Sequence, residues 1–83
     1  MTRDDIDNTV KDIFGDLFDV PPASITPQTS PDTLLEWDSL AHVRLIAAFE
    51  EKFDVIISAD NQVEMLNVEL IGDVLNDLKN QGA

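Results

Sequence analysis

Hydrophobic residues recur at helical spacing in several segments of the chain, beginning with the first. Its apolar positions are three or four residues apart: Ile6, Val10, Ile13, Phe14, Leu17 and Phe18. This spacing predicts a helix over about residues 4–18. Thr2 and Asp4 are candidate N-caps, because their side-chain oxygens can accept from the free backbone N–H groups of a first turn.

The next segment is a long irregular connection. All the prolines of the chain fall between Val20 and Asp32, and proline is excluded from helix interiors. A connection as long as residues 19–38 is unusual in a compact domain unless it has a role. We therefore expect its apolar side chains to fix it to the core: Val20, Ile25, Leu34 and Leu35.

A second helix is predicted from Asp38 or Ser39 to about Phe53, and it has two apolar faces. The core face is a stripe at helical spacing: His42, Leu45, Ile46, Phe49 and Phe53. His42 is expected to be a partly buried structural side chain. Nothing at a useful spacing would orient it as a catalyst.

The other face of this helix carries apolar residues among charges. Leu40 and Ala47 project to nearly the opposite side from the core stripe, and Val43 lies at the edge of that face. The charged positions are Arg44 and Glu51 within the face and Glu50 beside it. Folding requires only one apolar stripe, so the second one favours a docking surface, although scattered exposed apolar residues are normal.

The remaining chain predicts two further helices. Residues 54–59 are extended, and a short helix follows over about residues 60–66. Asn67 is the expected N-cap of a last helix, which Gly82 would follow and in which Gly72 marks close packing. The apolar face of this helix comprises Leu70, Ile71, Val74, Leu75 and Leu78. The fold class is therefore all-α: a single domain over residues 1–83, a small four-helix bundle with three main helices, a short one and a long first loop.

Composition limits the function. The 83 residues carry a formal net charge of -12, which argues against nucleic acid and favours partners with basic surfaces. No apolar run reaches the roughly 20 residues of a membrane span, and no signal peptide is visible. We expect a cytoplasmic monomer without membrane insertion. Because the chain has no cysteine, thioester chemistry would need a thiol from a prosthetic group.

The junction of the loop and the second helix is the strongest candidate site. Asp38 and Ser39 stand at a helix start, where either side chain can serve as an ordinary cap. The same end also favours phosphate, because free N–H groups and the positive end of the helix dipole meet there. An exposed serine at this place is suited to carry a phosphodiester.

At these residues the sequence resembles the acyl carrier protein family. The family signature, Asp-Ser-Leu at the start of the second helix after a long loop, is present as Asp38-Ser39-Leu40. Glu50-Glu51-Lys52-Phe53 then closes the helix, and an acidic short helix and an apolar last helix from Val68 follow. The resemblance covers about residues 4–80 and implies the acyl-carrier four-helix fold.

The resemblance also implies a mechanism and partners. A phosphopantetheinyl transferase would use coenzyme A and a metal ion to attach 4′-phosphopantetheine covalently to Ser39, with Asp38 assisting. The distal thiol would carry acyl groups as thioesters between acyl-loading and acyl-processing enzymes, while the carrier itself catalyses nothing and holds no metal. Docking is expected at the second face and its rim: Leu40, Val43, Arg44, Ala47, Glu50, Glu51 and Asp54. Rim charges mainly set encounter rate and specificity.

The chain departs from the family pattern in three places. Glu36 and Trp37 replace the usual small residue before the motif, and we expect Trp37 to be a packing residue. Ala41 and Arg44 stand where carriers of primary fatty-acid synthesis have acids, so a specialised, stand-alone carrier of a lipid, polyketide or other secondary-metabolite pathway is expected. Ser58-Ala59 replaces a frequent proline and acid, which leaves the boundary of the short helix open.

Other interpretations remain open. A peptidyl or aminoacyl carrier domain is the nearest, and an acidic helical interaction module without a prosthetic group is another. A calcium loop of the EF-hand type is excluded, because no stretch alternates oxygen ligands around a central glycine. The position of the cargo is also open, since one set of residues could line a cavity or fill a dry core: Phe14, Ile46, Phe49, Ile57 and Leu75.

Overall fold

The computed structural model describes residues 1–81 and is helical without strands over that range. Its elements are α1 (Arg3–Phe18), the short 3₁₀ helix η1 (Pro22–Ser24), α2 (Ser39–Phe53), α3 (Ala59–Glu64) and α4 (Val68–Gln81). The predicted all-α bundle of three main helices and a short one is confirmed. The expected stop at Gly82 lies outside the described residues. No helix in residues 1–81 has the length and apolar character needed to cross a membrane.

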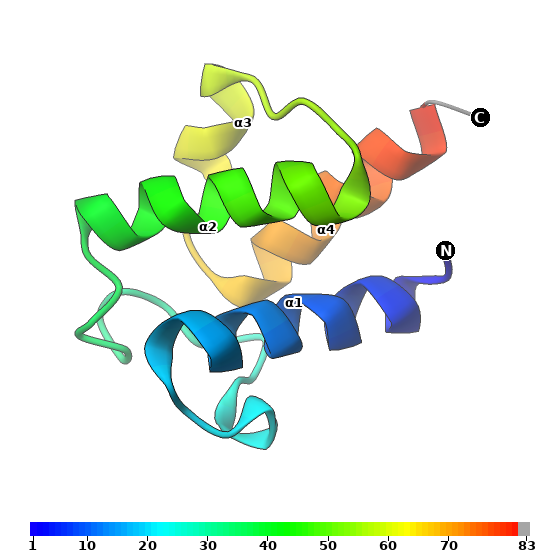
Figure 1. Cartoon of the computed structure of the whole chain (residues 1–83). Coiled ribbons are helices and arrows are strands. Elements are labelled where there is room, and N and C mark those ends of the chain that lie inside the picture. Colours follow the sequence, from blue (N-terminus) through cyan, green and yellow to red (C-terminus); the bar gives the residue numbers. More distant parts are fainter. Residues whose placement is uncertain (82–83) are drawn as a thin grey trace.

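The bundle is arranged around α1. This helix packs against both α2 and α4, and α3 packs against α4. Figure 1 shows α2 above α1, α4 crossing behind them and α3 at the far side of α2 from α1. The first residues of α2 therefore lie at the end of the bundle opposite the start of α1 and the end of α4.

The core comes from one face of each main helix. Leu45, Ile46, Phe49 and Phe53 are buried, as the core stripe of the second helix predicted. Phe14 of α1 is fully buried at the centre, with its ring 5.6 Å from that of Phe18 and 6.4 Å from that of Phe49. The five residues considered as a possible cargo cavity are all buried in this core: Phe14, Ile46, Phe49, Ile57 and Leu75.

Local side-chain caps set the helix starts. Thr2 caps α1 in a reciprocal capping box with Asp5, so the helix begins at Arg3 and Asp4 is not the cap. Asn67 caps α4 as predicted, accepting from the Leu70 N–H at 2.8 Å. The open boundary of α3 is fixed by Ser58, whose hydroxyl accepts from the Asn61 N–H at 3.2 Å.

The long first loop also caps the start of a helix that is distant in sequence. The carbonyl of Thr29 accepts from the Val68 N–H, and that of Pro27 accepts from the Glu69 N–H, both at 3.0 Å. These two donors belong to the first turn of α4. The N–H groups of a first turn have no acceptors within their own helix. The loop is therefore ordered by hydrogen bonding to α4 as well as by burial of Ile25.

The prediction that Leu35 fixes the loop to the core is wrong. Leu35 is 81% exposed, whereas Val20 and Leu34 pack against the core as expected. The loop turns through a hydrogen bond from the Trp37 N–H to the Leu34 carbonyl at 2.9 Å. This turn places Leu34 and Trp37 on the inner side and leaves Leu35 between them facing solvent.

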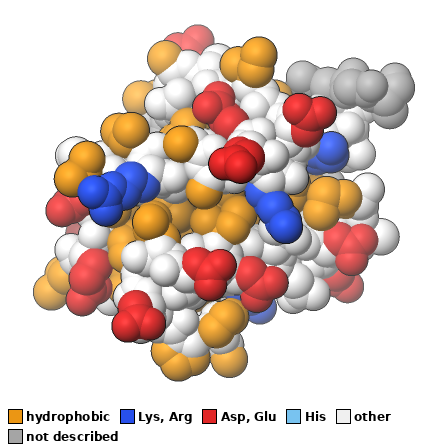
Figure 2. Space-filling view, viewed as in Figure 1, with side chains coloured by type: hydrophobic (Ala, Val, Ile, Leu, Met, Phe, Trp, Pro, Cys, Tyr) orange, Lys and Arg blue, Asp and Glu red, His pale blue; other side chains and the backbone are white. Residues whose placement is uncertain are grey.

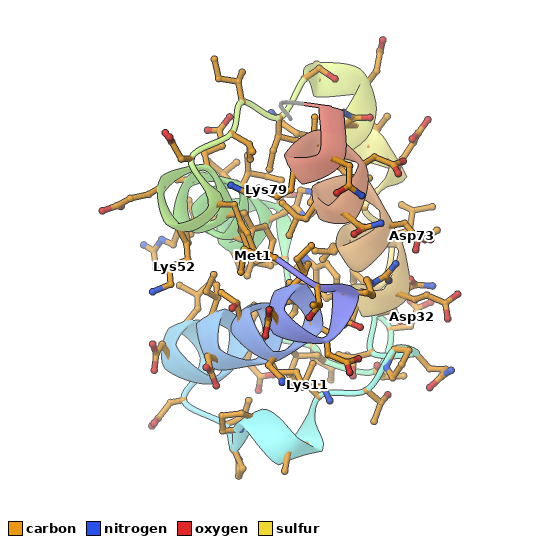
Figure 3. All side chains as sticks on the ribbon, turned by 90° about the vertical axis from the view of Figure 1, so that its right-hand side faces the viewer. Met1, Lys11, Asp32, Lys52, Asp73 and Lys79 are labelled. Carbon is orange, nitrogen blue, oxygen red and sulfur yellow. The ribbon has the colours of Figure 1, made fainter. Side chains whose placement is uncertain are left out.

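Polar contacts tie α4 to its neighbours. The Arg3 guanidinium binds Asp7 at 2.9 Å and Asp73 at 2.7 Å, and these hydrogen bonds raise the pKa of Arg3. A Cβ on Gly72 would lie 2.6 Å from this guanidinium, which confirms the close packing expected at that glycine. Lys79 lies between α4 and α2 (Figure 3) and donates to the Phe53 carbonyl at 3.0 Å.

The surface carries many acidic side chains, as the net charge of -12 indicates. Figure 2 shows acidic side chains spread over the face that it presents, with hydrophobic side chains in a band between α2 and α1 and others over α3. A surface of this sign repels nucleic-acid phosphates and attracts basic protein surfaces.

Replacement of a core ring should be far more costly than replacement of an exposed residue on the same helix. We expect Phe49→Ala to destabilise the fold by about 3–5 kcal/mol, because it leaves a cavity beside Phe14. The control Leu40→Ala should change stability by only about 0.5 kcal/mol, because Leu40 is exposed. Urea titration monitored by circular dichroism measures both, and equal losses would contradict the packing described here.

Candidate functional site

Two adjacent residues at the start of α2 have different roles. Asp38 is the N-cap, and its Oδ1 accepts from the Ala41 N–H at 2.9 Å. Ser39 is the first helical residue and is exposed. Within residues 1–81 no group hydrogen bonds to the Ser39 hydroxyl at the distances typical of such bonds. The cap interpretation therefore applies to Asp38 and leaves the serine oxygen free.

The backbone around Ser39 favours an anion. The first N–H groups of a helix lack partners within the helix, and the dipole places partial positive charge there. The chain is held in this position by turns in the preceding loop, including the hydrogen bond from the Asp38 N–H to the Glu36 carbonyl at 3.0 Å. A phosphate on Ser39 would lie at this positive end.

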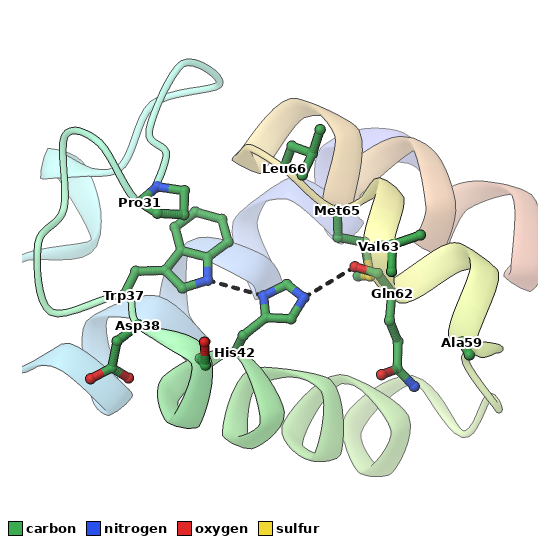
Figure 4. Close-up of a pocket in the computed structure, with 10 residues that line it drawn as sticks. Pro31, Trp37, Asp38, His42, Ala59, Gln62, Val63, Met65 and Leu66 are labelled. Carbon is green, nitrogen blue, oxygen red and sulfur yellow. Dashed lines mark hydrogen bonds between the residues drawn. The ribbon is translucent and has the colours of Figure 1, made fainter.

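A three-residue hydrogen-bonded chain lies beside the serine. The Trp37 indole N–H donates to His42 Nδ1 at 3.0 Å, and His42 Nε2 lies 3.1 Å from the Gln62 carbonyl oxygen (Figure 4). Because an indole only donates and a carbonyl only accepts, Nδ1 is the unprotonated nitrogen and Nε2 carries the hydrogen. His42 is thus a satisfied, half-buried structural side chain, as predicted.

Trp37 joins this chain to the core. It is 3% exposed, and its ring meets that of Phe14 edge-on at 5.1 Å and 79°. The expectation that Trp37 is a packing residue is confirmed. The Trp37 ring is also nearly parallel to the His42 ring, with 6.0 Å between centroids.

A pocket of about 600 Å³ opens next to Ser39, between the loop, α2 and α3. Its wall comprises Pro31, Trp37, Asp38, Ser39, His42, Ala59, Gln62, Val63, Met65 and Leu66. Figure 4 shows the loop residues on one side of this space and the α3 residues on the other. Its volume lies within the range of small-molecule sites in proteins.

The predicted docking residues extend along α2, from Leu40 beside Ser39 to Asp54 just after the C-terminal end of the helix. Those exposed on α2 are Leu40, Val43, Arg44, Ala47 and Glu51, and Asp54 is exposed just after the helix, in the left-handed conformation. Glu50 differs because it is half-buried and its Oε2 accepts from the Ile57 N–H at 2.9 Å. Glu50 therefore supports the segment after α2 in addition to any role at the surface.

The sequence interpretation missed the contribution of α3. Val63 and Leu66 are 71% and 64% exposed and face the pocket from the side opposite Ser39. Val63 lies in α3 and Leu66 just after it, and their spacing of three residues could have indicated an apolar face in this short segment. Ile56, in the segment before α3, is also exposed.

Comparison with known proteins agrees with this arrangement. A family model described as "Phosphopantetheine attachment site" matches residues 8–76. The chain belongs to the acyl carrier protein family. An acyl carrier protein of Thermosynechococcus vestitus is 37% identical over 77 residues, which cover 93% of this chain and 95% of that protein. One from Lactobacillus acidophilus is 32% identical over 79 residues, covering 95% of each.

Membership in the acyl carrier protein family fixes the general role. The chain is a non-catalytic acyl carrier, and its prosthetic group is 4′-phosphopantetheine, held covalently. Acyl carrier proteins interact with a phosphopantetheinyl transferase and with biosynthetic enzymes. The residues present fit the group, because an exposed hydroxyl with no internal partner stands at a helix N-terminus beside an open pocket.

Proposed function

We propose that Ser39 is the residue that carries the 4′-phosphopantetheine arm. A phosphopantetheinyl transferase joins the serine oxygen to the phosphorus of the phosphopantetheine part of coenzyme A. The nucleotide part leaves, and the hydroxyl proton passes to a base of the transferase. The distal thiol of the arm then holds acyl groups as thioesters, since the chain contains no cysteine that could do so.

One observation supports this assignment above the others. Asp38 caps α2, so the Ser39 hydroxyl is exposed and is not needed for the stability of the helix. A serine that was itself the cap would have to release its hydrogen bond to the helix for its oxygen to attack the phosphorus. Ser58 illustrates that case at the start of α3, where its hydroxyl accepts from the Asn61 N–H.

We further propose that partner enzymes dock on the exposed face of α2. Leu40 and Val43 would supply apolar contact, with Ala47 allowing close approach. Glu51 and Asp54, together with the free oxygen of Glu50, would attract basic patches on the partner. The pathway is proposed to be a specialised one, because Arg44 places a positive charge in the same face and disfavours strongly basic partners.

Two alternatives would give different results in solution. A peptidyl or aminoacyl carrier would also take the arm but would be loaded with an aminoacyl group. An interaction module without a prosthetic group would not be modified at all, and the family match supports a carrier over this alternative. We propose the acyl form, as one carrier domain over residues 1–83 that acts as a cytoplasmic monomer.

Among the serines of the chain, Ser39 should be the one that is modified. Incubation with coenzyme A and a promiscuous phosphopantetheinyl transferase should add one phosphopantetheine to the wild-type chain, as measured by intact mass. Ser39→Ala should gain nothing. The control Ser58→Ala, which alters the serine at another helix start, should be modified like the wild type. Modification of Ser39→Ala would disprove the assignment.

Asp38 can be tested separately for its two roles. Asp38→Asn keeps a good N-cap, so stability should be unchanged within a few tenths of a kcal/mol. Loss of the carboxylate should still slow phosphopantetheinylation, on the order of 10-fold, equivalent to about 1.4 kcal/mol. Asp38→Ala removes both the cap and the charge, so it should slow modification and also lower stability by about 1 kcal/mol. Modification rates and thermal unfolding measure the two effects, and wild-type rates in Asp38→Asn would contradict a functional role for its charge.

The docking face can be tested at Val43, the more exposed of its two large hydrophobic residues. Val43 is 65% exposed, so Val43→Asp should leave the fold intact while it weakens association with a partner enzyme. We expect roughly a 10-fold loss in kcat/KM for acyl transfer, since a desolvated apolar contact is replaced by a charge. Asn8→Asp adds the same charge on α1 and should have little effect. Equal losses in both variants would indicate a charge effect and not docking.

A further inference from the structure

We propose that His42 positions Ser39 for attachment of the arm by holding the Trp37 indole, and that it releases the indole when its ring binds a proton. The proposal rests on the proposed function of Ser39 as the attachment point. It makes His42 a positioning residue that acts through Trp37, and it makes the attachment reaction sensitive to pH.

Trp37 and His42 bracket the start of α2. With Asp38 as the N-cap, Trp37 is the residue just before the cap and His42 is the fourth residue of the helix. Side-chain contact between these two positions fixes the direction in which a chain enters a helix, and the usual contact is apolar. Here it is polar, because the indole N–H donates to Nδ1 at 3.0 Å and the two rings lie within 15° of parallel. Ser39 lies inside this bracket, so the same contact sets its position relative to the loop.

The Trp37 indole depends on a single acceptor. Trp37 is 3% exposed and packs edge-on against Phe14, so water has little access to its N–H. Within residues 1–81, His42 Nδ1 is the one acceptor that the indole N–H reaches. A buried donor without a partner is unfavourable. The position of the indole is therefore stabilised by the unprotonated state of Nδ1.

Protonation of the imidazole removes that acceptor. The other ring nitrogen, Nε2, already carries a hydrogen, which it donates to the Gln62 carbonyl at 3.1 Å (Figure 4). A proton added to the ring must go to Nδ1, where it would point at the indole N–H. Two donors would then face each other, so the link from Trp37 to α2 would be lost while the link to α3 remains. Imidazoles change charge between about pH 5 and pH 8.

The charged groups around His42 offer the indole no substitute. Asp38 is the one other titratable side chain that lines the pocket beside His42, and its Oδ1 already accepts from the Ala41 N–H. Within residues 1–81 the imidazole is hydrogen bonded to no carboxylate. The other charged residues of the packed segments that lie closest in sequence do not line the pocket: Asp32 and Glu36 of the loop, Arg44 and Glu50 of α2, and Asp60 and Glu64 of α3.

The indole N–H resonance reports the bond directly, because Trp37 is the only tryptophan of the chain and His42 the only histidine. In the intact chain, the proton and nitrogen shifts of the indole should change between about pH 8 and pH 5 with the same midpoint as the ring C–H shifts of His42. In His42→Gln they should stay constant, since an amide supplies an acceptor and a donor and does not titrate. Indole shifts that stay constant while the wild-type imidazole titrates would overturn the proposal.

The rate of attachment should follow the same titration. Intact mass gives the kcat/KM of a promiscuous phosphopantetheinyl transferase with coenzyme A for the wild type and for His42→Gln at each pH. The ratio of the two values cancels the pH dependence of the enzyme and of the 17 acidic residues, which both proteins share. This ratio should fall roughly 3- to 10-fold from about pH 8 to about pH 5, as the loss of one hydrogen bond predicts. A ratio that does not change with pH would contradict the positioning role.

Trp37→Phe is the matched control. It keeps a ring that can pack against Phe14 but has no N–H, so no hydrogen bond is lost when His42 binds a proton. Its rate relative to that of His42→Gln should not depend on pH. A fall as large as that of the wild type would assign the effect to the charge of His42 alone and overturn the part given to the indole.

The readouts separate this inference from the proposed function. Circular dichroism establishes that each variant is folded, and the indole titration of the wild type decides the inference without any variant. A wild-type chain that is modified at no pH refutes attachment at Ser39. Modification at a ratio independent of pH refutes only the role of His42.

Discussion

The edge-on contact of Trp37 with Phe14 holds the loop, the start of α2 and the pocket wall in one arrangement. Phe14 lies on the helix that packs against both other main helices, so a loop residue anchored to it is fixed relative to the whole bundle. Asp38 and Ser39 follow immediately in sequence, which leaves little freedom in where the serine lies. The indole thus positions the candidate attachment point by packing, and its N–H extends the same constraint to His42 and α3.

The helices could be predicted from the sequence because their signals are local. Apolar spacing and the caps Asn67 and Asp38 act within a few residues, and each predicted helix is present within one or two residues of its expected bounds. The loop could be predicted only in part. Whether Leu35 or Trp37 faces inward depends on a partner in α1 that is distant in sequence. The hydrogen bonds from the first turn of α4 to Pro27 and Thr29 have the same long-range origin.

The candidate site shows a similar division. Asp38-Ser39-Leu40 could be read directly, because a helix start and its chemistry are contained in adjacent residues. The pocket could not, since its walls come from three separate segments and exist only after α3 folds against α4. Glu50 is an intermediate case: its position beside the second face was visible, but its hydrogen bond to the Ile57 N–H depends on the path of the chain after α2.

The separation of cap and hydroxyl at the start of α2 has a consequence for the folding equilibrium. Within residues 1–81 no hydrogen bond of the Ser39 hydroxyl has to break when a group is attached to it, because the cap of α2 is Asp38. The free energy of unfolding would then be similar with and without the arm, apart from a favourable interaction of its phosphate with the helix dipole. Attachment of the arm therefore requires no rearrangement of the hydrogen bonds that begin α2, and the only expected change in stability is the favourable one from the phosphate.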